Sequence, residues 1–273
     1  MKIITVMEDT CGNESCAFEH GLSVYVETKK HKILLDTGAT GAFAENAKKL
    51  GIDLKTIDTV VLSHGHYDHS GGILTFAEYN RSAAIYVSSG ADGAYYHGSR
   101  YIGIDRRILD LPQLVRIKGE YRIDEELSLF TGIKGRRYWP QSNLLLEEEV
   151  DGKRQQDEFK HEQCLVIRQK ERNVLLSGCA HNGILNILDR YHEIYGGVPD
   201  VVISGFHMMK KGDYTKEEEA VIVKTAEELA AYDTVFYTGH CTGQKAYDLM
   251  KPVMGEKLQP MHSGLILMNE EEI

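Results

Sequence analysis

Residues 60–72, VVLSHGHYDHSGG, constrain the fold of this chain more than any other stretch. An apolar strand leads directly into a polar cluster and then two glycines; the cluster comprises His64, His66, Asp68 and His69. Side chains two apart on an extended backbone project to the same side, so the first two histidines can hold one cation. The last two residues fall at a turn where they can face a second cation. Imidazole and carboxylate donors favour zinc, with iron or manganese as alternatives.

Three further histidines follow apolar strands in the second half of the chain. They occur in GCAHNG as His181, in SGFH as His207 and in TGHCTG as His240. Each comes after a strand and a glycine and precedes a helix or loop. This recurring position accounts for part of an unusual total of 12 histidines.

The apolar pattern predicts strands and helices along most of the chain. We expect strands over residues 2–7, 22–27, 31–36, 59–63, 84–88, 164–169, 173–177, 200–204, 234–238 and 264–268. Helices are expected over 41–50, 74–79, 182–195, 215–231 and 244–251, and Thr215 and Glu218 have the spacing of a capping box. Early hairpins followed by β-α alternation indicate a layered α/β fold in which helices cover sheets.

The apolar residues of the segment 91–152 show neither helical nor strand periodicity. They contain glycine, arginine and tyrosine clusters, the lone Trp139 and short apolar runs. We expect an insertion of hairpins and loops that serves as a substrate cover or a homodimer surface.

Composition excludes several classes of protein. A net charge of −10 disfavours binding to the nucleic-acid backbone. No apolar run has membrane-spanning length, and residues 1–9 lack the features of a secretory signal. Five cysteines, an odd number, argue against a disulfide framework. A cytoplasmic location is therefore expected.

The motif H-x-H-x-D-H after a strand resembles the hallmark of the metallo-β-lactamase superfamily. ILLDTG at residues 33–38 is similar to the strand in that family whose aspartate, here Asp36, supports the metal loop. The resemblance implies one domain over residues 1–273, an α/β fold of the four-layer αβ/βα sandwich type, and two divalent metal ions at one edge. The combination of EHGLS, GCAHNGI, GFH and GHCTG resembles the branch that includes an archaeal dihydropterin–ribofuranosylaminobenzene-phosphate synthase.

The resemblance also implies which residues bind the metals. His64, His66 and His181 would hold the first ion, and Asp68, His69 and His240 the second. The order G-C-A-H departs from the usual pattern of the family, so two alternatives stay open. Cys179 is either a bridging ligand or merely buried, and His161 is a rival to His181.

His207 has no place in the general ligand pattern of the family. It is either a loop histidine or a catalytic group that faces the substrate as an acid or hydrogen-bond donor. The remaining histidines are expected on the surface or in the core, although His20, in EHGLS, could face the site from a neighbouring loop.

The expected function is metal-dependent hydrolysis of an ester, phosphoester or lactone-type small molecule. Two metals would generate hydroxide from water. Asp68 would be a metal ligand and would also orient this hydroxide. One alternative is a transferase that joins a dihydropterin pyrophosphate to an aminobenzene ribofuranosyl phosphate; another is a non-catalytic ligand-binding protein. Phosphorylated substrates would need cations, for which the candidates are Arg106–Arg107, Arg136–Trp139 and Lys210–Lys211.

Overall fold

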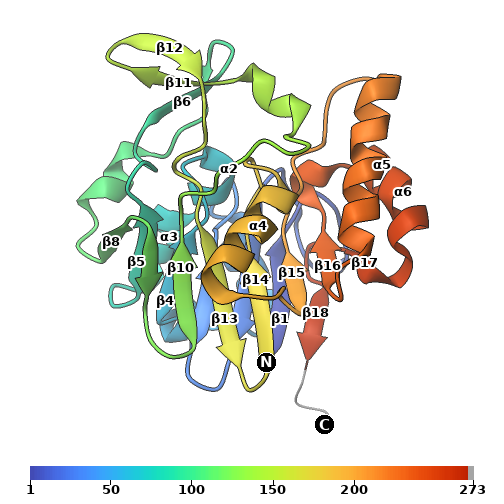
Figure 1. Ribbon diagram of the computed structural model, residues 1–273. Helices are drawn as coiled ribbons and strands as arrows, with labels where there is room; N and C mark the ends of the chain where they lie inside the picture. Colours follow the sequence, from blue (N-terminus) through green and yellow to red (C-terminus); the bar gives the residue numbers. More distant parts are fainter. Residues whose placement is uncertain (270–273) are drawn as a thin grey trace.

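The computed structural model describes residues 1–269, which form two facing seven-stranded sheets with helices on their outer sides (Figure 1). In the first sheet the strand order is β18-β1-β2-β3-β4-β5-β8. Its strands are β1 (Lys2–Met7), β2 (Ser23–Glu27), β3 (Lys32–Leu35), β4 (Thr59–Leu62), β5 (Ala84–Ser88), β8 (Leu114–Ile117) and β18 (Ile266–Asn269).

The second sheet has the order β17-β16-β15-β14-β13-β10-β9. Its strands are β9 (Glu120–Arg122), β10 (Leu127–Phe130), β13 (Cys164–Gln169), β14 (Arg172–Leu176), β15 (Val201–Ile203), β16 (Val235–Thr238) and β17 (Leu258–Pro260). Strands β3, β4, β5 and β8 are parallel, as are β14, β15, β16 and β17. Each sheet therefore has several carboxyl ends at one edge.

Alternating side chains divide the interior into three layers of core. Ile33 and Leu35 of β3 point between the sheets, where they join a buried cluster with Leu165 and Leu176 of the second sheet. Leu34 points the other way, into the core beneath the outer helices. This alternation produces the expected four-layer αβ/βα sandwich.

Helices cover the outer face of each sheet. The first sheet is packed by α1 (Ala42–Lys49) and α3 (Ile73–Tyr79), and the second by α4 (Ile184–Tyr195), α5 (Lys216–Ala230) and α6 (Gln244–Met254). The predicted capping box of α5 is present: the Thr215 hydroxyl accepts from the Glu218 N–H, and the Glu218 carboxylate accepts from the Thr215 N–H. The structure extends α6 three residues past its predicted end, because Pro252 is tolerated in its last turns.

The structure divides the segment 91–152 differently from the expected insertion. Residues 114–130 include β8, β9 and β10, which complete the two main sheets, and Leu127 and Leu129 are buried between them. The flanking parts form a small third sheet from β6 (Ala94–His97), β7 (Arg100–Tyr101), β11 (Leu146–Val150) and β12 (Lys153–Gln156). The prediction failed for the middle part because strands of three or four residues carry too little alternation to stand out.

The small sheet lies over the short helix α2 (Tyr67–Ser70), which belongs to the histidine motif (Figure 1). The Tyr67 N–H donates to the Ile102 carbonyl, and Tyr67 packs against a small core that contains Tyr95 and Phe159. The amino terminus and the end of β18 lie at the opposite end of the molecule (Figure 1). Thus the third sheet forms a cover on the side of the histidine motif.

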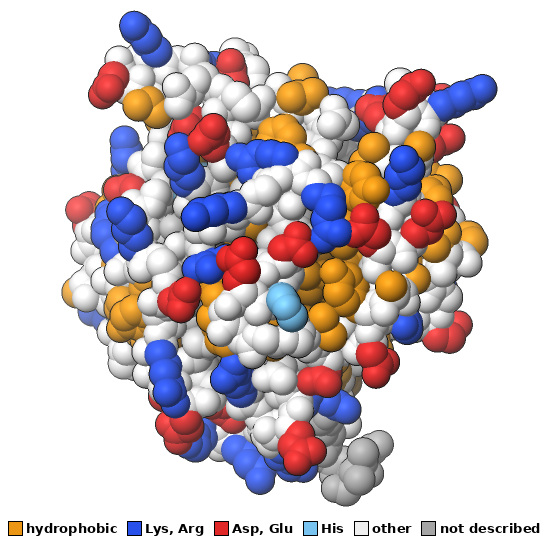
Figure 2. All heavy atoms as spheres, viewed as in Figure 1, with side chains coloured by type: hydrophobic (Ala, Val, Ile, Leu, Met, Phe, Trp, Pro, Cys, Tyr) orange, Lys and Arg blue, Asp and Glu red, His pale blue; other side chains and the backbone are white. Residues whose placement is uncertain are grey.

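On the face shown in Figure 2, positive and negative side chains are interspersed, and little histidine surface is visible. Most of the histidines of the motifs are instead buried. Across residues 1–269, helices that combine enough length with enough apolar character to cross a membrane are absent.

Candidate metal centre

The polar motifs of both halves of the chain meet at one edge of the sandwich. His64 follows β4, and Cys179, His207 and His240 follow β14, β15 and β16. Since β14, β15 and β16 are parallel, their carboxyl ends lie together. Asp9 follows β1 at the same edge, because β1 and β3 both run antiparallel to β2.

Asp36 fixes the histidine motif from below. Its carboxylate accepts from the Ser63 N–H and the Ser63 hydroxyl, both at 2.7 Å. It also accepts from His69 Nδ1 at 2.7 Å, and all three groups are fully buried. Because the Nδ1 proton of His69 is committed to this bond, Nε2 is left as a lone pair that faces the site.

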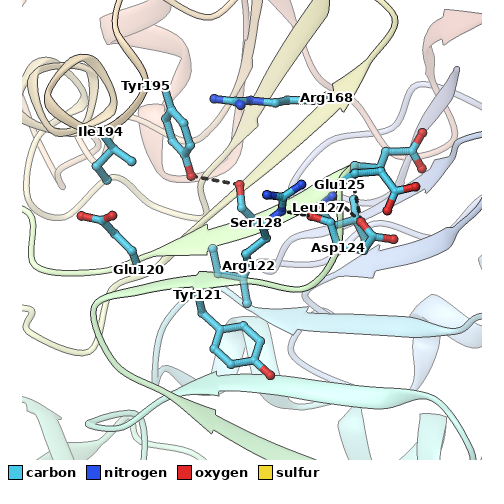
Figure 3. Close-up of a pocket in the computed structure, with 12 residues that line it drawn as sticks. Glu120, Tyr121, Arg122, Asp124, Glu125, Leu127, Ser128, Arg168, Ile194 and Tyr195 are labelled. Carbon is cyan, nitrogen blue, oxygen red and sulfur yellow. Dashed lines mark hydrogen bonds between the residues drawn. The ribbon is translucent and has the colours of Figure 1, made fainter.

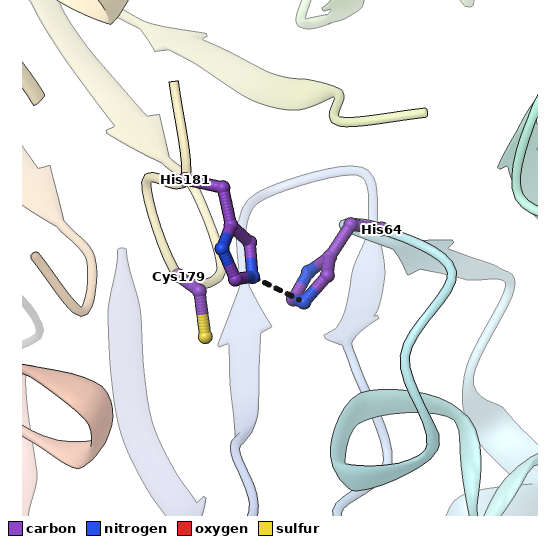
Figure 4. Close-up of side chains that lie close together, drawn as sticks. All are labelled: His64, Cys179 and His181. Carbon is purple, nitrogen blue, oxygen red and sulfur yellow. Dashed lines mark hydrogen bonds between the residues drawn. The ribbon is translucent and has the colours of Figure 1, made fainter. Parts of the chain in front are cut away.

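His64, His181 and Cys179 form the first group (Figure 4). His64 Nδ1 donates to Ser63 Oγ at 2.9 Å, and His181 Nδ1 donates to Asn143 Oδ1 at 3.0 Å. The two Nε2 atoms therefore face each other, at 3.2 Å.

His66 lies beside this group at the start of α2, and it also clusters with Asp157 and His161. Its ring centroid lies 4.6 Å from that of His64 and 4.9 Å from that of His181. Burial, together with the nearby His161, lowers the pKa of His66 to about 3, and burial lowers the pKa of His64 and His181 well below the ordinary value. All three rings are therefore neutral, which is the form that binds a metal.

Asp68, His69 and His240 form the second group. Asp68 Oδ2 lies 3.7 Å from His69 Nε2 and 3.5 Å from His240 Nε2. His240 Nδ1 donates to Asp9 Oδ1 at 2.6 Å, which turns Nε2 inward. Burial opposes the charge of Asp68, but the adjacent His69 and His240 outweigh it and hold its pKa well below the usual range.

Cys179 lies between the two groups and is shared by both. Its Sγ is 3.1 Å from His69 Nε2, and the side chain is buried. Of the two alternatives left open by the sequence, this place fits a bridging position better than a purely packing role.

Unpaired polar atoms show that the two groups fit metal ions. Within residues 1–269, the buried Nε2 atoms of His66 and His240 have no hydrogen-bond partner. A buried polar atom without a partner costs about 1–3 kcal/mol, and here several imidazole lone pairs converge. Imidazole, carboxylate and thiolate are the donors that zinc prefers, and they also suit iron.

His161 has a hydrogen-bond partner at each ring nitrogen, and it also clusters with His66 and Asp157 as a possible ligand. Its Nδ1 accepts from the Gly65 N–H at 2.9 Å, so its Nε2 carries the proton that it shares with Asp157 at 3.1 Å. Both nitrogens are thereby engaged, whereas His181 offers a free Nε2. The geometry favours His181 over its rival.

His207 lies beside the first group, with its ring 4.0 Å from that of His181. The Ser142 hydroxyl donates to the His207 carbonyl, so His207 Nδ1 donates to Ser142 Oγ at 2.9 Å. Burial, with His66 and His240 nearby, lowers the pKa of His207 to about 3. The neutral ring presents Nε2 as an acceptor, which disagrees with the expected role of acid; its catalytic role stays a prediction.

The backbone at this edge is strained. Four non-glycine residues of the site have positive φ: Asp36 (58°), Ala180 (44°), His207 (50°) and His240 (48°). Such angles cost about 1–3 kcal/mol each for residues other than glycine and concentrate at functional sites. At Gly178 a side chain is excluded outright, because a Cβ there would overlap Ser63 Oγ.

The sequence interpretation missed two supporting residues and left a third undecided. Asp9 and Asn143 orient His240 and His181, yet neither stands in a recognisable motif. Asp9 follows a buried strand, the same position that marks Asp36 and the strand-end histidines. His20 does face the site: its Nδ1 donates to Asp9 Oδ2 at 2.7 Å, and its Nε2 is 3.6 Å from Asp68 Oδ2.

The basic candidates are mostly paired elsewhere. Arg107 pairs with Asp105, Arg137 with Asp189 and Glu228, and Lys210 with Glu218. Arg136 differs, because it lies over the Trp139 ring and donates to Asn182, next to His181.

A surface hollow of about 340 Å³ lies elsewhere (Figure 3). Its lining residues include Glu120, Asp124, Ser128, Arg168 and Tyr195. Ser128 and Tyr195 form a hydrogen bond across it. Arg168 lies near the far end of β13 from Cys164, so this hollow is remote from the histidines.

Comparison with known proteins identifies the family. The model of the metallo-beta-lactamase superfamily matches residues 17–232. The chain belongs to this superfamily. A crystal structure of a metal-dependent hydrolase of the beta-lactamase superfamily has a TM-score of 0.82 and 33% identity, and the match covers 98% of this chain and 99% of that one. The predicted family and fold are therefore confirmed.

Two archaeal relatives come from Methanocaldococcus jannaschii. One is an uncharacterized protein, 29% identical over 89% of this chain and 92% of its own length. The other is a 7,8-dihydropterin-6-methyl-4-(beta-D-ribofuranosyl)-aminobenzene-5'-phosphate synthase, 27% identical over 98% of this chain and 96% of its own length. The resemblance to the branch that includes this synthase is confirmed as well.

Proposed function

We propose that this member of the superfamily is a two-metal hydrolase of an ester, phosphoester or lactone-type small molecule, with zinc as the metal. The observation that supports it most is the convergence of Nε2 atoms from two groups around Cys179. The first group offers neutral imidazoles, and the second adds the Asp68 carboxylate. The Nδ1 atoms of four of these histidines each have a hydrogen-bond partner: His64, His69, His181 and His240. Sites for metals are built in this way.

Two divalent metals, when bound, lower the pKa of water and polarise a carbonyl or phosphoryl oxygen of the substrate. The chain's own residues would hold the metals and orient the histidines that bind them. The supports accept an Nδ1 proton and so orient the rings: Asp36 accepts from His69, Asn143 from His181, and Asp9 from both His240 and His20. Asp68 contributes a carboxylate that stays ionised. His207 offers Nε2 as a hydrogen-bond acceptor to a proton on the substrate or on water.

The first test is activity before and after chelation. We expect purified, metal-loaded protein to hydrolyse at least one member of a panel of phosphodiesters, phosphomonoesters, thioesters and lactones. Removal of the metals is expected to lower the rate by about 10³-fold, since each metal contributes several kcal/mol. Re-addition of zinc should restore it. Fully loaded protein that is inactive on every class would contradict the proposal.

A transferase is the second candidate, favoured by the match to the archaeal synthase over nearly the full length of both chains. In that case a pterin pyrophosphate and an arylamine phosphate would release pyrophosphate in the presence of the loaded protein. Pyrophosphate release without activity on the hydrolysis panel would select the transferase over the hydrolase.

Arg136 provides a test of substrate charge. If the substrate bears a phosphate, Arg136→Ala should raise KM about tenfold, because a hydrogen bond to a charged group contributes about 1.5–3 kcal/mol and this arginine lies near the surface. The kcat value should change little, since Arg136 stands next to Asn182 rather than among the metal-facing atoms.

The matched control is Arg107→Ala, which removes an equally basic and exposed side chain that pairs with Asp105 instead. An equal change of KM in both variants, or none in either, would show that Arg136 does not contact the phosphate. A neutral substrate of the same class should respond to neither substitution.

A further inference from the structure

His20 stands out among the histidines because it lies outside the ligand pattern of the family and yet faces the second group. It comes from the loop between β1 and β2, and its side chain is 46% exposed. An exposed ion pair with Asp9 would be the simplest explanation, and such pairs contribute at most about 1 kcal/mol. An ion pair with Asp9 alone does not explain why this loop is also held against Asp68.

The backbone of this loop is held against the metal motif. The Leu22 N–H donates to the Asp68 carbonyl at 3.2 Å. A Cβ at Gly21 would lie 2.8 Å from the Asp68 carbonyl oxygen and 2.6 Å from the Ala39 nitrogen, so only glycine permits this approach. Glu19 closes the loop by accepting from the N–H groups of Ala39 and Thr40. These backbone contacts thus hold His20 next to Asp68.

One carboxylate orients two histidines. Asp9 accepts from His20 Nδ1 through Oδ2 at 2.7 Å and from His240 Nδ1 through Oδ1 at 2.6 Å. The two rings stack, with centroids 4.8 Å apart. Because both Nδ1 atoms bond to Asp9, the Nε2 atom of each ring lies on the side of Asp68.

The distances from Asp68 are close to those between neighbouring ligands of one ion. Asp68 Oδ2 lies 3.6 Å from His20 Nε2, 3.5 Å from His240 Nε2 and 3.7 Å from His69 Nε2. Bonds of about 2.0–2.2 Å in a tetrahedral zinc site place adjacent donor atoms about 3.3–3.6 Å apart. The His240 Nε2 atom is also buried and, among residues 1–269, without a hydrogen-bond partner.

We propose that His20 is an additional ligand of the second metal, beside Asp68, His69 and His240. This inference rests on the two-metal centre proposed above. The Asp9 carboxylate then serves as a common support for two ligands, which explains why it is turned away from solvent toward both rings.

The test is metal binding by purified full-length protein, measured with zinc and with cobalt(II). His20→Ala should weaken the second binding step about 100-fold, the upper end of what the loss of a mere supporting residue costs, while the first step stays unchanged. The cobalt(II) absorption of the second site should shift. His192→Ala, which removes an exposed histidine at the end of α4, should match the unsubstituted protein in both measurements.

The possible outcomes are distinguishable. If the unsubstituted protein takes up no second ion, the two-metal proposal itself fails. If it takes up two ions and His20→Ala binds both with unchanged affinity and absorption, the assignment of His20 as a ligand is wrong, even if the variant is slower. Because the side chain is half exposed, the variant should keep its cooperative unfolding transition.

Discussion

Alanine at His66 or at His240 is expected to lower the bound metal from about two ions per chain to about one and the activity by about 10³-fold. The two residues belong to different groups, His66 beside His64 and His181, and His240 beside Asp68 and His69. Each Nε2 is buried and, over residues 1–269, has no hydrogen-bond partner, so neither substitution breaks a hydrogen bond at that atom. We therefore expect each substitution to lower metal content more than it lowers the stability of the fold.

Metal content by elemental analysis and unfolding by denaturant would separate these effects. His97→Ala is a suitable control, because His97 is exposed on β6 in the small third sheet. Full metal content in both His66→Ala and His240→Ala would contradict the site. A double variant should lose both ions if the two groups are separate.

Asp36→Ala is the second substitution with a large expected effect. It removes the acceptor for the Ser63 N–H, the Ser63 hydroxyl and His69 Nδ1, all of which are buried. Breaking a buried charged network of this kind costs about 3–5 kcal/mol of unfolding free energy. Metal affinity should also fall about 10- to 100-fold or more, because His69 loses the partner that fixes its tautomer.

Asp36→Asn separates shape from charge. Asparagine tolerates the left-handed backbone that Asp36 adopts, at φ 58°, and keeps one oxygen acceptor. We expect a smaller loss of stability than for alanine but a clear loss of metal affinity. Equal stability of all three proteins in denaturant titrations would show that Asp36 is not the support described above.

Several parts of the site could be predicted from the sequence because their signal is local. A strand that ends in H-x-H-x-D-H reveals both the backbone direction and the donor atoms, and His181 and His240 repeat the pattern of strand, glycine and histidine. The carboxyl ends of parallel strands share an edge, so these separate segments meet. The four-layer arrangement followed from the family resemblance.

Other parts could not be predicted because their roles depend on contacts between distant segments. Asn143 supports His181 from a short helical turn in a stretch without any period, and Asp9 supports His240 across 231 positions of sequence. The strands within residues 114–130 were missed for a related reason: each has only three or four residues, and only its neighbours in the sheets define it.

The most direct test of the central claim is a crystal structure of the metal-loaded protein with anomalous scattering collected at the zinc edge. Two anomalous peaks are predicted. The ion at one peak should be bound by Nε2 of His64 and His181 together with His66. The ion at the other should be bound by Asp68, His69 and His240, with Cys179 between the two ions. A single peak, or peaks outside these residues, would contradict the two-metal centre.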